Sequence, residues 1–141
     1  MHKGLFTAGA LALASTGCSA GGDRTLAEGA VAQFRQMRDA GRYAEIYQGS
    51  AQEIKSTVSE AQLVQTLGNT HIHYGNFRSA NQTNWHWNSS NGNVLVTLAY
   101  DTQYERGRGD ERFVYRIENG AARLAGYHIN APGPAPPGNS Q

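Results

Sequence analysis

The sequence predicts an α+β fold, in which N-terminal helices pack on a curled antiparallel sheet of about four strands. Apolar residues recur at close to the helical spacing as far as Tyr74, and beyond it they alternate with a period of two. Turn signals such as Asn91-Gly92 and Asn119-Gly120 separate the alternating runs. Helices followed by strands that short hairpins connect are typical of this fold class.

The first helix is expected over residues 26–41, because its apolar side chains fall on one face and Gly41 ends the run. Those side chains are Leu26, Ala30, Phe34 and Met37. Shorter helical segments are expected over residues 43–47 and 51–58.

A third helix is expected to begin after Ser59. Ser59-Glu60-Ala61-Gln62 has the Ser-x-x-Gln form of a capping box, in which two side chains satisfy free amides at the helix start. The helix carries Leu63 and Leu67 on its apolar face and is expected to close at Gly68-Asn69.

The strands are expected between Tyr74 and Asn130. Trp85 and Trp87 share one face of the first strand, on either side of His86. The next two strands each carry a strongly apolar face, formed by Val94, Val96, Leu98 and Tyr100 and by Phe113, Tyr115 and Ile117.

Residues 1–17 are predicted to be a lipoprotein signal peptide. A positive start, Met1-His2-Lys3, precedes an apolar stretch of about ten residues, which fits a signal core and is too short to span a bilayer. Ala14-Ser15-Thr16-Gly17-Cys18 resembles the lipobox of bacterial lipoproteins, whose cysteine becomes the lipidated, palmitate-bearing first residue. By the same resemblance, Ser19 implies the outer membrane, with the domain facing the periplasm. The alternative is cutting after Ala20 and secretion to the periplasm.

The remaining chain divides into a tether at residues 18–25, the α+β domain at residues 26–130 and a disordered tail at residues 131–141. All four prolines lie in this tail, which has no large apolar side chain to offset the entropy of ordering. The formal net charge of +1 offers little attraction to nucleic acid, so no nucleic-acid partner is expected. A single cysteine excludes an internal disulfide and a cysteine-based zinc site.

Several short motifs lie within residues 26–130, namely Ser59-x-x-Gln62, Gly75-x-x-Arg78, Tyr100-Asp101-Thr102-x-Tyr104, Glu111 and Leu124-Ala125-Gly126-Tyr127-His128-Ile129. Together they resemble a family of uncharacterised bacterial envelope lipoproteins. The resemblance covers about residues 26–130 and implies the cone of the nuclear transport factor and ketosteroid isomerase superfamily, with helices packed into a curled sheet. That family has no established activity, so the resemblance leaves the function open.

The sequence predicts no catalytic residue, no metal site and no cofactor. A zinc site would need three or four histidines to converge. His71 and His73 are expected to point to one side of a strand, away from His86 and His128 on other strands. Asp101 is expected to point away from the apolar face of its strand, which argues against a pocket acid there.

The function expected is binding of a protein partner or a small ligand, and the membrane is a further partner through lipidated Cys18. Trp85 and Trp87 are the candidate interface residues, because polar side chains flank them along their strand. One alternative is an enzyme of the ketosteroid isomerase-like superfamily with a pocket acid. Another is an immunity or inhibitor lipoprotein that acts against an envelope hydrolase.

Overall fold

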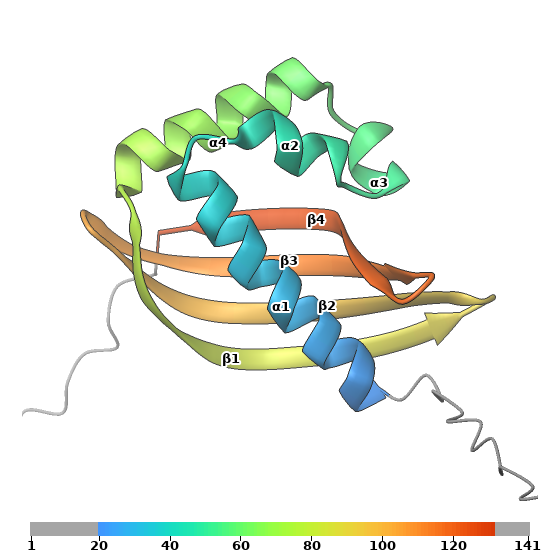
Figure 1. Ribbon diagram of the computed structural model, residues 1–141. Helices are drawn as coiled ribbons and strands as arrows, with labels where there is room; N and C mark the ends of the chain where they lie inside the picture. The colour runs from blue at the N-terminus through green and yellow to red at the C-terminus, as the bar shows by residue number, and fades with distance from the viewer. Residues whose placement is uncertain (1–19, 132–141) are drawn as a thin grey trace, which may run out of the picture.

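The computed structural model describes residues 20–131. Cys18 and the predicted signal peptide lie outside this range, as do residues 132–141 of the predicted tail. The described chain forms helices that cover one face of a four-stranded antiparallel sheet, so the α+β prediction is confirmed (Figure 1). None of the helices in residues 20–131 has the length and apolar character needed to cross a membrane.

The helices come first in the chain and the strands follow without interruption. The helices are α1 (Ala20–Asp39), α2 (Tyr43–Gln48), α3 (Gln52–Lys55) and α4 (Glu60–Tyr74). The strands are β1 (Phe77–Ser90), β2 (Asn93–Tyr104), β3 (Gly107–Glu118) and β4 (Ala121–Asn130). They are hydrogen-bonded in the order β1-β2-β3-β4, and α1 crosses the sheet diagonally (Figure 1).

The predicted tether is wrong over residues 20–25, because these residues form the first turns of α1. Gly21 and Gly22 each disfavour a helix by about 1 kcal/mol relative to alanine. A contact with the sheet acts in the opposite direction, since the buried carboxylate of Asp23 accepts a hydrogen bond from the indole of Trp87 at 3.0 Å. Tertiary packing therefore extends the helix beyond the segment that its own sequence favours.

The predicted start of α4 is confirmed and its predicted end is wrong. The Ser59 hydroxyl accepts from the Gln62 amide at 3.2 Å, and the Gln62 side chain accepts from the Ser59 amide at 2.9 Å. The helix does not close at Gly68-Asn69 but continues to Gly75, whose φ of 77° ends it. Gly68 packs on the Tyr43 ring, where an added Cβ would lie 3.6 Å from Cε2.

Alternation along β2 and β3 divides the sheet into an inner face under the helices and an outer face without helices. The inner face and the helices enclose one core, in which most of the apolar surface is removed from contact with water. The strand side of this core consists of Val96, Leu98, Tyr100, Phe113, Tyr115 and Leu124, and the helix side includes Ala27, Val31, Phe34, Ile46, Leu63 and Leu67.

Candidate functional site

The interior is the first place where this fold could hold a site, and it is filled by aromatic side chains. The Phe34 ring on α1 packs on Phe113 and Tyr127 of the sheet, with centroid separations of 5.1 and 4.8 Å. Phe34 and Phe113 are 2% and 0% exposed. Side chains packed at this density occupy the space that a ligand in the middle of the sheet would need.

A carboxylate nevertheless lies inside, on Glu111 of β3. Its side chain is fully buried and accepts hydrogen bonds from Thr102 on β2 and Tyr127 on β4, each at 2.6 Å. Nη2 of Arg35 on α1 lies 3.4 Å from Oε1 and supplies the opposite charge. A buried carboxylate needs donors and a counterion of this kind, because burial of an isolated charge is very unfavourable.

The Arg35 guanidinium covers the carboxylate on the helix side. It lies 4.3 Å from the Phe77 ring centroid and 4.7 Å from that of Tyr100, and its side chain is 12% exposed. These contacts keep water from Glu111. In this arrangement the hydrogen bonds of the carboxylate join β3 to β2 and β4, and its ion pair with Arg35 joins the three strands to α1.

Sequence reasoning considered Asp101 as the pocket acid and missed Glu111. Asp101 lies on the outer face as expected, where it accepts from Arg108 at 2.7 and 2.8 Å. Glu111 could have been found by alternation, because it lies two residues before Phe113 and therefore on the same face.

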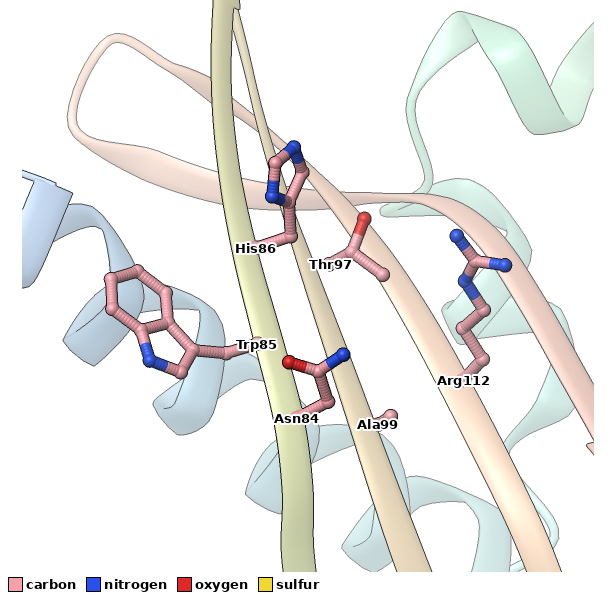
Figure 2. Close-up of a pocket in the computed structure, with 6 residues that line it drawn as sticks. All are labelled: Asn84, Trp85, His86, Thr97, Ala99 and Arg112. Atoms are coloured by element: carbon pink, nitrogen blue, oxygen red, sulfur yellow. The ribbon is translucent and has the colours of Figure 1, made fainter.

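The outer face of the sheet contains a hollow of about 480 Å³. We call it the outer hollow; its lining residues are Asn84, Trp85, His86, Thr97, Ala99 and Arg112. Small side chains on β2 form its floor, and longer polar side chains of β1 and β3 stand on either side (Figure 2). The Trp85 ring extends away from the others, toward α1 (Figure 2).

Arg112 differs from its neighbours on the outer face of β3. Arg108 is paired with Asp101, and Arg116 is paired with Glu53. Within residues 20–131, no ion pair or hydrogen bond of the Arg112 side chain is found. An exposed guanidinium with free donors at the rim of a hollow can bind a carboxylate through two parallel hydrogen bonds.

The two predicted interface residues lie on the inner face, at the start of α1. Trp87 is half-buried and donates to Asp23. Trp85 is 38% exposed, with the Arg24 guanidinium 4.8 Å from its ring centroid. Both tryptophans therefore contact the same helix, and Trp85 keeps a large exposed surface.

Of the histidines expected on strands, His86 and His128 lie on β1 and β4. His71 and His73 lie on α4, not on a strand, so the prediction that they point to one side is wrong. His71 instead forms hydrogen bonds with Tyr43 at 2.5 Å and Asn76 at 2.6 Å. In the described part of the chain, no three metal-ligating side chains come together.

A smaller hollow of about 250 Å³ lies between α3, α4 and the edge strand β4. Its apolar lining includes Ile54, Val58, Leu63 and Tyr127. This groove is the place where a small apolar group could bind without displacing the core.

Comparison of the chain with protein-family models, with curated proteins and with solved structures finds no match. The resemblance to envelope lipoproteins and to the cone superfamily therefore stays a prediction.

The buried tyrosines provide a matched test of the Glu111 network. We expect Tyr127→Phe to lower the free energy of unfolding by about 1–3 kcal/mol, because it removes a donor from a buried carboxylate. Tyr115→Phe is the control, since the Tyr115 hydroxyl is buried with no hydrogen-bond partner in residues 20–131. Its loss is expected to leave stability unchanged or higher in urea unfolding. Equal destabilisation by both variants would contradict the role of the network.

Stability is expected to fall in alkaline solution. Burial, followed by the charge of Glu111, raises the pKa of Tyr104 and Tyr127 well above the usual value, and burial raises the pKa of Tyr115. An unfolded chain loses these protons near pH 10, whereas the folded chain retains them. Since the unfolded state then binds fewer protons, the free energy of unfolding decreases as the pH rises above about 10.

Ultraviolet absorbance of tyrosinate and circular dichroism measure this effect together. We expect ionisation of the three buried tyrosines to coincide with loss of the β-sheet band in the circular dichroism spectrum. Ionisation of all tyrosines with an unchanged sheet signal would contradict the prediction.

Proposed function

We propose that this protein is a binding module, anchored by lipidated Cys18 to a bacterial envelope membrane, and that the outer hollow is its contact surface. The lipobox-like segment that ends at Cys18 supports the anchor. The resemblance to envelope lipoproteins is consistent with an outer-membrane position facing the periplasm. The binding role rests on the shape and charge of the uncovered sheet face.

Arg112 is the observation that carries the binding role. It is exposed at the rim of the outer hollow, and it lacks the carboxylate partners that Arg108 and Arg116 have. His86 and Asn84 add polar groups beside a floor of Thr97 and Ala99. This combination suits a protein partner that presents a carboxylate on a convex surface.

A protein partner fits the outer hollow better than a substrate does, because no hydrogen bond joins a nucleophile to a base among its lining residues. An immunity or inhibitor role is one form of this proposal, in which Arg112 would contact an acidic residue of an envelope hydrolase. The enzyme alternative rests on Glu111. It is disfavoured because all the contacts of that carboxylate are internal and its side chain is sealed from solvent.

Photo-crosslinking in cells tests the contact surface. We expect a crosslinker at Thr97 on the hollow floor to capture a discrete partner, and a crosslinker at exposed Gln65 on α4 to capture none. Arg112→Glu is expected to abolish the Thr97 product, because it places a like charge against the acidic group of the partner. Arg78→Glu is the matched control, since Arg78 is exposed on β1 but does not line the hollow. Capture from Gln65 and not from Thr97 would refute the assigned surface.

Fractionation tests the anchor independently. We expect Cys18→Ala to move the protein out of the membrane fraction and to abolish incorporation of an alkyne-labelled palmitate. Ser19→Ala is expected to keep both properties, because it retains the acceptor thiol. If Cys18→Ala stays with the membranes, the lipid anchor is wrong.

A further inference from the structure

The start of α1 is close to the proposed lipid anchor in the sequence. Ala20 is the first residue of α1 and follows Cys18 by two positions. Two residues of chain span at most about 7 Å between Cα atoms. The start of α1 is also fixed to the sheet, because buried Asp23 accepts the Trp87 indole hydrogen bond. The domain therefore has little freedom to turn away from a bilayer that holds Cys18.

Two exposed apolar side chains lie on either side of the start of α1. Large apolar residues are exposed at three positions in residues 20–131, namely Leu26, Ile72 and Trp85. Leu26 lies on the second turn of α1 and is 40% exposed, while Trp85 lies under Arg24 and is 38% exposed. Leu26 thus lies within the first two turns of α1, and Trp85 lies on β1 beside Arg24 of the same two turns.

A hollow of about 370 Å³ adjoins Leu26, between α1 and the first residues of β4. None of its lining residues carries a charge, so contact with lipid would not strip water from an ionised group. The lining consists of Thr25, Leu26, Gly29, Ala30, Gln33, Ala121 and Ala122.

We propose that the lipidated protein rests on the membrane with the start of α1, Leu26 and Trp85 against the lipid surface. This orientation depends on the proposed anchor at Cys18. Tryptophan is suited to such a place, because its ring is apolar and its N–H can meet the polar headgroup layer. The Arg24 guanidinium lies over the Trp85 ring and is paired with Glu28 at 2.7 Å, so the charge next to Trp85 already has a counterion.

The orientation has a consequence for the binding role. Trp85 borders the outer hollow, but its ring extends toward α1 and away from the other lining residues (Figure 2). A bilayer that contacts α1 and Trp85 leaves Arg112 and the rest of the outer hollow open to a periplasmic partner.

Fluorescence quenching tests the orientation, because the chain has only two tryptophans. Trp87→Phe leaves Trp85 as the single emitter. The lipidated variant is bound to phosphatidylcholine and phosphatidylglycerol vesicles whose acyl chains carry bromine near the headgroups. We expect the Trp85 emission to be quenched and its maximum to move to shorter wavelength. The difference between wild type and Trp85→Phe provides the same readout if Trp87→Phe weakens the fold.

The control places the emitter on α4, near the C-terminal end of α1. Ile72 is 76% exposed there, near the residues that Arg38 contacts. Lipidated Ile72→Trp with Trp85→Phe and Trp87→Phe is expected to keep its emission in the same vesicles.

The outcomes separate the orientation from the anchor. Vesicle-bound protein whose Trp85 is unquenched, or is quenched no more than Trp at position 72, overturns the orientation and leaves the anchor intact. Protein that carries no lipid and stays off the vesicles overturns the anchor, and the orientation with it. Selective quenching of Trp85 that disappears in Cys18→Ala supports both.

Discussion

The buried carboxylate of Glu111 is the interaction on which the rest of the domain depends. This side chain of β3 accepts one hydrogen bond from a hydroxyl on β2 and one from a hydroxyl on β4, and it forms an ion pair with a guanidinium on α1. One side chain therefore connects three strands and the helix that crosses them. Such a group adds specificity to a packed interface, because any shift of α1 would leave a buried carboxylate without its counterion Arg35.

Because of this arrangement, the candidate site lies on the surface of the domain and not in its interior. Arg35, Phe34 and the aromatic rings of the sheet close the space around Glu111, so the acid that could have served catalysis is held as a structural group. The uncovered side of the sheet is left with a polar hollow and with Arg112, whose donors are free in the described part of the chain. These two facts support the binding role that we propose.

The two faces of β1 then have separate roles in our proposal. His86 and Asn84 point to the outer hollow, and Trp85 and Trp87 point to α1 on the other side. Because the start of α1 is only two residues from Cys18, the same contacts that hold the helix on the sheet also set which side meets the membrane. In this proposal the membrane contact uses the α1 side of the sheet, and recognition uses Arg112 and the other side chains that line the outer hollow on the opposite face.

Residue periodicity and contacts within a few residues predict the order of elements, the capping box at Ser59 and the two faces of the strands. Tertiary structure sets where α1 begins and where α4 ends. The Asp23 to Trp87 bond joins residues 64 positions apart, and the Tyr43 ring accommodates Gly68 inside a helix. The partners of Glu111 were also decided there, since hydrogen bonds between distant strands and a helix leave no local signal in the chain.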